Sequence, residues 1–174
     1  MNHVPLSARV MPATWSAAVL AVIGVTAWAS GVPWLFPSLG PTLAIQTEAP
    51  AHPVARPWNV VAGHAIGAAV GIAAVWLTGA VHEPAVNVVH LVSATRLVAA
   101  IAAMFSSMAL QSMARASHPP AQATTLLIAL GALDADLHGA LVLAVGVAQV
   151  ALLGEVARRM RLRHAAHAAP DTSR

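Results

Sequence analysis

The stretch that decides the fold is Arg115-Ala116-Ser117-His118-Pro119-Pro120, which is followed by the apolar run of residues 121–131. Two consecutive prolines fix the backbone φ angle and remove two N–H donors, so they cannot lie inside a helix, although the second can occupy a first turn. A helix is therefore predicted to begin at about Pro120. Its roughly ten apolar residues are too few to cross a membrane, which needs about 20. The stretch predicts a half-helix.

The N-terminus of such a half-helix is suited to an anion. Its first backbone N–H groups have no partner within the helix, and the positive end of the helix dipole lies there. Ser117 and His118 stand beside it, and Arg115 comes just before. Discontinuous helices whose N-termini face a substrate near the middle of the bilayer are a known transporter device.

The composition indicates an integral membrane protein. Of 174 residues, 58% are hydrophobic and only 9% are charged, far from the composition of a soluble domain. Because cysteine is absent, disulfides and thiolate metal sites are excluded. There is no nucleophile motif or phosphate loop, so we expect no enzyme. The arginine-rich residues 158–163 follow an apolar run, and they indicate a positive-inside anchor rather than a nucleic-acid site.

Four membrane spans are predicted, at residues 14–30, 57–80, 91–113 and 137–156. Between the first two lies a second proline-rich entry, Phe36-Pro37-Ser38-Leu39-Gly40-Pro41-Thr42, which predicts a second half-helix starting near Pro41. Residues 48–56 and 81–90 are predicted connectors, and residues 158–174 a partly disordered tail. The fold class is thus an all-α membrane protein with four transmembrane helices and two short re-entrant or broken half-helices.

The second span carries Gly63, Gly67 and Gly71 at four-residue spacing, a ridge of small residues that lets another helix backbone approach closely. On the same span, Asn59 and His64 are polar groups that need a partner or water. Gln111 belongs to a polar group toward the end of the third span, either a cavity wall beside His118 or a set of interhelical hydrogen bonds. Both alternatives stay open from the sequence.

The two halves of the chain, about 14–80 and 91–156, repeat one pattern. Each has a span, a Ser-x-x-Pro entry (residues 38–41 and 117–120), a half-helix and a second span with a histidine near its start, His64 or His138. Re-entrant half-helices would give four crossings with both termini cytoplasmic, and would leave Arg56 and Arg115 outside, against the positive-inside trend. If each half-helix instead crosses the membrane together with an extended stretch of chain, the two repeats have inverted orientations. The sequence leaves this choice open.

Two blocks of residues resemble the HPP family of integral membrane proteins. The first runs from Phe36-Pro37-Ser38-Leu39-Gly40 through Asn59 to Gly63-His64, and the second is His118-Pro119-Pro120-Ala121 with Ala123-Thr124. The resemblance spans about residues 15–155. It implies a four-helix membrane domain at residues 14–156, between an N-terminal segment 1–13 and a basic tail 157–174, and some family members are described as nitrite transporters.

The leading functional hypothesis is a transporter or channel for a small inorganic anion, nitrite first. The resemblance carries over eight site residues: Ser38, Gly40, Asn59, His64, His118, Pro119, Pro120 and Thr124. The flanking Ser117, Arg115, Arg56 and Gln111 complete the candidate substrate-binding set. In this hypothesis His118 and free N–H groups after Pro120 hold the anion, and His64 carries a coupled proton.

The expected surroundings are a lipid bilayer and a second copy of the chain, with no nucleic acid and no cofactor. The expected location is the bacterial inner membrane, crossed several times, with both termini cytoplasmic. Two other functions remain open at this point: a non-transporting scaffold or sensor subunit, suggested by the glycine ridge, and a haem protein using His64, His118 or His138.

Overall fold

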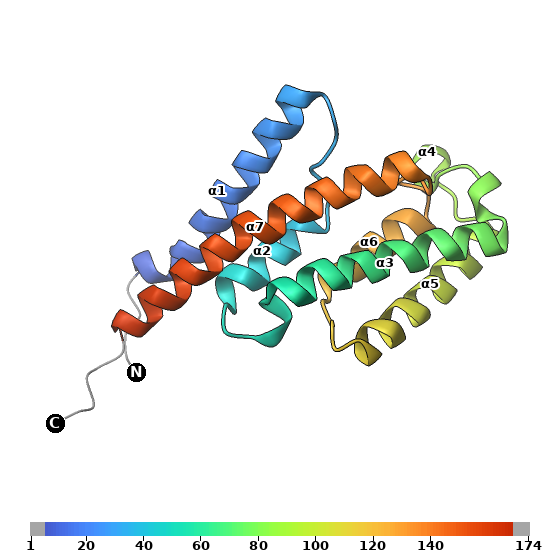
Figure 1. Ribbon diagram of the computed structural model, residues 1–174. Helices are drawn as coiled ribbons and strands as arrows, with labels where there is room; N and C mark the ends of the chain where they lie inside the picture. The colour runs from blue at the N-terminus through green and yellow to red at the C-terminus, as the bar shows by residue number, and fades with distance from the viewer. Residues whose placement is uncertain (1–5, 169–174) are drawn as a thin grey trace.

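The computed structural model describes residues 6–168, and within that range it consists of helices and connecting segments with no strand (Figure 1). Its elements are α1 Leu6–Ser30, α2 Leu39–Glu48, η1 Pro53–Ala55, α3 Pro57–Thr78, η2 Ala80–His82, α4 Val86–Val89, α5 Ala94–Met113, α6 Pro120–Ala129 and α7 Leu137–Ala168. Four of them, α1, α3, α5 and α7, are long and apolar enough to cross a membrane. This confirms the predicted fold class.

The two half-helices, α2 and α6, have ten residues each. As predicted, α6 begins at Pro120, with Pro119 as its N-cap residue. The other half-helix begins at Leu39, two residues before the predicted Pro41, which lies in its first turn. After α6, Gly131 adopts φ +78°, a left-handed conformation that favours glycine.

Contacts between distant segments show the direction of the first two helices relative to α7. Arg161 of α7 approaches Met11, and Gln149 accepts a hydrogen bond from Thr26, so α1 is antiparallel to α7. The Arg161 side chain also bonds the Thr47 carbonyl at the end of α2, whereas Phe36, just before α2, packs on Gly146. The second helix therefore runs parallel to α7.

The remaining directions follow in the same way. Gly63 of α3 faces His118 and Gly71 faces Ile128, so α3 and α6 are parallel. Thr125 of α6 bonds Ser107 of α5, while Arg96 near the start of α5 reaches the end of α6, so α5 and α6 are antiparallel. Trp76 near the end of α3 donates to the carbonyl just before α7, so α3 and α7 are antiparallel.

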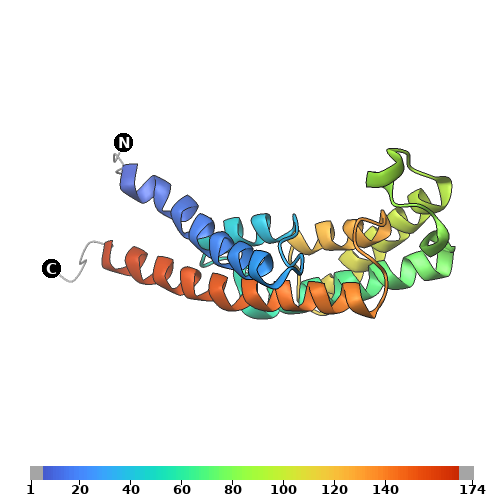
Figure 2. The same ribbon diagram turned by 90° about the horizontal axis from the view of Figure 1, so that it is seen from above.

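The helices therefore form an inverted repeat. In the first half α1 and α3 run one way and the half-helix α2 runs back; in the second half α5 and α7 run back and α6 runs forward. Each half-helix, together with the extended residues before it, crosses the bundle. Of the two topologies that the sequence left open, the structure has the crossing one. Helix α1 lies beside α2 and α7, and α5 beside α3 and α6 (Figure 2).

Both ends of the described chain lie at one end of the molecule, called here the terminal end; α4 lies at the opposite, far end (Figure 1). Arg56 stands at the start of α3, and Arg115, after α5, lies near the same first turn. Both arginines therefore lie toward the terminal end, with the arginines of α7. Re-entrant half-helices would have placed both arginines on the opposite side from the termini, and the crossing topology places them on the same side. Asp134 and Asp136 lie at the far end.

The ends of the long helices also differ from prediction. Helix α1 already begins at Leu6, inside the segment 1–13 that was set apart from the membrane domain. Helix α7 continues to Ala168, so the expectation of a disordered tail was wrong for residues 157–168. Glu155 explains part of this, because its carboxylate pairs with Arg158 and Arg159 one turn later, each at 2.6 Å. Residues 169–174 lie outside the described range.

The packed core contains side chains from α1, α2, α3, α6 and α7, among them Ile23, Leu43, Val60, Ile128 and Val150. Large apolar side chains also cover the outside of the long helices, including Trp28, Leu77, Phe105 and Leu152. In a soluble protein such an exposed apolar surface would be a liability, whereas lipid tails are an apolar solvent. The bilayer is therefore the natural surrounding of this surface.

Candidate functional site

The N-terminal turns of the two half-helices meet inside the molecule in a cluster of five polar side chains. This central cluster consists of Ser38 and Thr42 of the α2 entry, His64 of α3, and His118 and Thr124 of the α6 entry, and each has 0% of its surface exposed. Buried polar groups are stable only when they are hydrogen-bonded. The cluster meets this requirement through its own members.

The five side chains form one continuous chain of hydrogen bonds. The Ser38 hydroxyl lies 2.8 Å from the Thr124 hydroxyl, which lies 2.8 Å from Nδ1 of His64. The Nε2 atom of His64 is 3.2 Å from Oγ1 of Thr42, and the same oxygen is 3.0 Å from Nε2 of His118. The two imidazole rings meet edge to face, with centroids 5.2 Å apart. One hydroxyl, that of Thr42, thus joins both histidines.

Neighbouring helices hold His118 in place. Its backbone N–H donates to Oε1 of Gln111 at 3.1 Å, and the Gln111 amide donates to Ser107 and to the Gly63 carbonyl. A Cβ atom on Gly63 would lie only 2.7 Å from Cβ of His118, so glycine is required for this approach. Of the two roles left open for Gln111, the structure therefore has interhelical hydrogen bonding.

Asn59 has a similar supporting role. Its amide donates to the Ser117 carbonyl at 2.9 Å, which ties the stretch before α6 to the first turn of α3. The Ser117 side chain itself is exposed. These contacts fix the path of the backbone into α6, and they leave the buried hydroxyls and imidazoles as the groups available for chemistry.

The first N–H groups of α6 are already bonded. Ala121 donates to the His118 carbonyl at 2.9 Å, and Gln122 donates to the Pro119 carbonyl at 3.0 Å. The prediction that free N–H groups after Pro120 hold an anion is therefore wrong for these two residues. The role of Pro119 and Pro120 is to fix the residue at which α6 begins. At Ala121 and Gln122 no backbone N–H is left to bind an anion directly, so the polar side chains of the cluster are the donors considered below.

Several predicted site residues lie away from the cluster. Arg56, Arg115 and Pro119 are exposed, and so is Gly40, around which a Cβ atom would meet nothing within 4 Å. Pro120 is buried in the first turn of α6. The residues that the structure brings together are Ser38, His64, His118 and Thr124.

Sequence reasoning missed Thr42 as a site residue. It lies four residues after Ser38, and this spacing places two side chains on one face of a helix. The next residue at this spacing, Gln46, is also 0% exposed, and neither atom of its amide has a hydrogen-bond partner among the described residues. Gly154 of α7 faces this amide, and any side chain there would collide with it. One face of α2 is therefore polar from the central cluster toward the terminal end.

Arginines cover the outer ends of both half-helices. Arg161 donates to the Thr47 carbonyl at 3.0 Å at the end of α2, and Arg96 donates to the Ala129 carbonyl at 3.0 Å at the end of α6. Cations at a helix C-terminus offset the negative end of its dipole. The positive ends of both dipoles point at the central cluster, so the electrostatic environment there favours negative charge.

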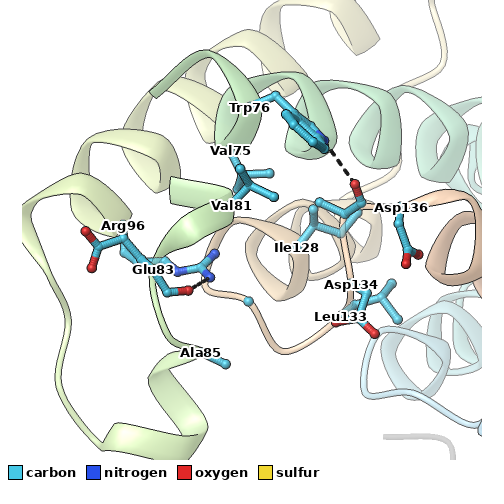
Figure 3. A pocket seen from close by; sticks show the side chains of 12 residues that line it. Val75, Trp76, Val81, Glu83, Ala85, Arg96, Ile128, Leu133, Asp134 and Asp136 are labelled. Carbon is cyan, nitrogen blue, oxygen red and sulfur yellow. Dashed lines mark hydrogen bonds between the residues drawn. The ribbon is translucent and has the colours of Figure 1, made fainter. Parts of the chain in front are cut away.

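A cavity around Arg96 is lined by side chains of α3, of α6 and of the segments that follow them (Figure 3). It has a volume of about 280 Å³ and is lined by Trp76, Glu83, Asp134 and Asp136 among others. Arg96 is 5% exposed and also donates to the Glu83 carbonyl. Its guanidinium thus donates to the backbone carbonyls of Glu83, Pro84 and Ala129, which is the pattern of a structural arginine.

A second cavity, of about 260 Å³, lies between α3 and α7 and reaches His64. Its other lining residues are alanine, valine and leucine. Within residues 6–168, no group of three or more His, Cys, Asp or Glu side chains is placed to hold a metal ion.

A family model described as HPP, transmembrane region, matches residues 1–165. The chain belongs to the HPP family. No curated protein and no solved structure is similar enough to this HPP chain to count as a match. Membership agrees with the spans, the two proline entries and the apolar outer surface described above, and it establishes a membrane protein.

Proposed function

We propose that this HPP protein is a transporter or channel for a small monovalent inorganic anion, with nitrite as the first candidate, and not an enzyme. One observation carries the proposal: two inverted half-helices direct their N-termini at one buried cluster of hydroxyls and imidazoles. Inverted repeats with broken helices at the middle of the bundle are a transporter architecture.

The chemistry of the cluster supports an anion of this size. Hydroxyl groups of Ser38, Thr42 and Thr124 can donate hydrogen bonds and replace water around an ion, and imidazole N–H groups can do the same. No carboxylate belongs to the cluster. Both helix dipoles add positive potential in a region of low dielectric constant, where such potentials act strongly.

The approach to the cluster is proposed to run along α2 from the terminal end. Arg56 and Arg115 are exposed there and raise the local concentration of anions. From that end, the unpartnered amide of Gln46 is followed by Thr42 and Ser38 on the same face of α2. A polar amide without a partner inside a membrane protein is costly, and such groups mark substrate pathways.

The orientation proposed is with the terminal end in the cytoplasm of a bacterial cell. Arg9, Arg56, Arg115 and the arginines of α7 lie toward that end, whereas Asp134 and Asp136 lie at the far end. Cytoplasmic ends of membrane proteins carry an excess of arginine and lysine. Re-entrant half-helices would place Arg56 and Arg115 outside, against this rule. The crossing topology places them with the other arginines, in agreement with it.

The test is nitrite uptake into proteoliposomes that contain the purified protein, compared with protein-free liposomes. His118→Ala is expected to abolish protein-dependent uptake, and His138→Ala, at an exposed histidine beside the far end, is the matched control. Uptake that survives in the His118 variant rejects the site. The absence of protein-dependent uptake of nitrite, nitrate, formate and chloride rejects the function.

The structure weakens the reasoning behind the two other functions. The ridge of Gly63, Gly67 and Gly71, which suggested a scaffold, is covered by α6 of the same chain. Haem ligation needs a free imidazole nitrogen, but each ring nitrogen of His64 and His118 lies within hydrogen-bond distance of a protein oxygen. Association of two or more copies remains part of the proposal, since four spans enclose little space for a pathway.

A further inference from the structure

We propose that the central cluster binds one proton together with each anion, that the proton is held on Nε2 of His118, and that the hydroxyl of Thr42 changes its acceptor when it arrives. This inference rests on the proposed function. It follows from assigning each hydrogen atom of the cluster to a donor and an acceptor, using the observed distances.

The partner of Nδ1 determines the tautomer of His118. Its Nδ1 atom lies 2.8 Å from the carbonyl oxygen of Val54, and a carbonyl oxygen can only accept a hydrogen bond. Nδ1 therefore carries a hydrogen. In the neutral ring, Nε2 then has a lone pair, and it needs a donor.

The donor is the hydroxyl of Thr42, at 3.0 Å. If its hydrogen points to His118, its oxygen accepts from Nε2 of His64, at 3.2 Å. Nδ1 of His64 then accepts from the hydroxyl of Thr124, which in turn accepts from the hydroxyl of Ser38. In the neutral state every hydrogen in the cluster points along the chain in one direction, and every group has a partner.

The structure contains a second acceptor for the same hydroxyl. Oγ1 of Thr42 also lies 2.9 Å from the carbonyl oxygen of Ser38. When Nε2 of His118 gains a proton, the Thr42 hydrogen turns to that carbonyl, and the two lone pairs of Oγ1 accept one N–H from each histidine. The proton is taken up on a lone pair, no bond to carbon changes, and no polar group loses its partner. An alternative acceptor at this position thus makes the protonated state as well satisfied as the neutral one.

Among residues 6–168, no carboxylate contacts the imidazole of His118, so the protonated state has no counter-ion beside it there. The elements around His118 present His64 from α3, the uncharged Thr42 from α2, Gln111 from α5, and the Val54 carbonyl from η1. Beside η1, the exposed His52 accepts a hydrogen bond from the Val54 backbone N–H. On α7, which packs on α2 and α3, the charged residues Glu155 and Arg158 pair with each other.

Two positive helix ends and a protonated imidazole therefore meet without a carboxylate in the cluster. A monovalent anion supplies the missing charge. Proton and anion together are neutral, and the inference is an electroneutral transport of one proton with one anion.

The experiment measures proton and nitrite movement in the same proteoliposomes, using a pH-sensitive dye inside them and a potassium–valinomycin clamp of the membrane potential. The expected result is internal acidification in equal amount to the nitrite taken up, with a rate that does not depend on the clamped potential. Nitrite uptake that follows the potential and moves no proton overturns the inference while leaving the anion transporter in place.

Variants of α2 test the role assigned to Thr42. Thr42→Val keeps the shape but removes the hydroxyl, and we expect uptake to fall about tenfold or more. Thr42→Ser keeps the hydroxyl and is expected to stay within about twofold of the unmodified protein. Thr47→Val, at a buried threonine five residues later on the same helix, is the control for folding. Equal uptake by Thr42→Val and Thr42→Ser overturns the inference.

A readout that does not need transport is nitrogen NMR of histidine-labelled protein in lipid nanodiscs. Neutral His118 is expected to carry its hydrogen on Nδ1, and added nitrite is expected to raise the pH at which Nε2 becomes protonated. If no anion is transported, the proposed function fails. This spectrum still shows whether His118 takes up a proton when nitrite is added. A neutral His118 with its hydrogen on Nε2, or a titration that nitrite leaves unchanged, overturns the inference.

Discussion

Replacing Gly67 with alanine tests the close packing of α3 on the half-helix α6. Gly67 lies in the middle of the ridge on α3, against the backbone of α6. A Cβ atom there would lie 2.7 Å from Oγ1 of Thr125 and 2.9 Å from the Ala121 carbonyl oxygen. Ordinary contacts begin near 3.4 Å, so the helices would have to separate by 0.5–0.7 Å, the differences 3.4 − 2.9 and 3.4 − 2.7.

The magnitude follows from two opposing effects. Overpacking of a close contact costs about 1–3 kcal/mol, and Thr125 cannot simply turn away because it is buried and bonded to Ser107. Alanine also stabilises a helix relative to glycine, by about 1 kcal/mol. Gly24→Ala, in the middle of α1, is the matched control, because a Cβ atom on Gly24 would meet only Cδ2 of Leu35, at an ordinary contact distance of 3.7 Å, and mainly the favourable effect remains. The difference between the two variants should therefore be about 1–3 kcal/mol.

The measurement is thermal unfolding of both variants in the same nanodiscs, followed by tryptophan fluorescence. At about 2–4 °C per kcal/mol for a chain of this length, Gly67→Ala should unfold about 2–12 °C below Gly24→Ala. If Gly67→Ala unfolds at the same temperature as Gly24→Ala or higher, then α3 and α6 do not approach as closely as described, and the reasoning fails.

Three further predictions concern single side chains. Gly63→Ala should lower nitrite uptake even where the protein still folds, because the new methyl group displaces His118, and uptake at the unmodified level in a folded variant would contradict this. Arg96→Met should lower the free energy of unfolding by about 1–3 kcal/mol, since buried carbonyls lose their donor, whereas Arg56→Met at an exposed position should change it by less than about 0.5 kcal/mol; equal effects in thermal unfolding would refute the difference. Gln46→Leu should leave the unfolding temperature unchanged or higher, because it removes an unsatisfied buried amide, and should reduce uptake if that amide lies on the pathway; a large loss of stability would show that the amide has a partner.

Local sequence patterns predicted the elements of this fold well. The Pro119–Pro120 pair places the start of α6 correctly because its effect on φ and on N–H donors acts within one turn. Helix directions were not predictable in this way. The residues 32–36 before the turn into α2 can lead into it on either side, and the choice depends on contacts such as that between Thr47 and Arg161, which are 114 residues apart.

The candidate site was predictable in part for the same reason. Ser38, His64, His118 and Thr124 stand out as polar residues next to helix breakers or within an apolar span, and they meet in the structure. Thr42 did not stand out, because a threonine inside a helix often bonds its own backbone, as this one also does to the Ser38 carbonyl. Its importance depends on two histidines from other helices.

The arginines at the outer ends of the half-helices restrict how this protein can move. Arg158 and Arg161 of α7 attach the end of α2 and the loop after it, at Thr47 and Pro50, to the second repeat. The two repeats are thus interlocked, and rocking them against each other as rigid blocks would break these bonds. Movement that leaves them intact is a tilt of each half-helix about its fixed outer end, with the largest displacement at its inner end. The central cluster lies at these inner ends, so such a tilt would change its hydrogen bonds first.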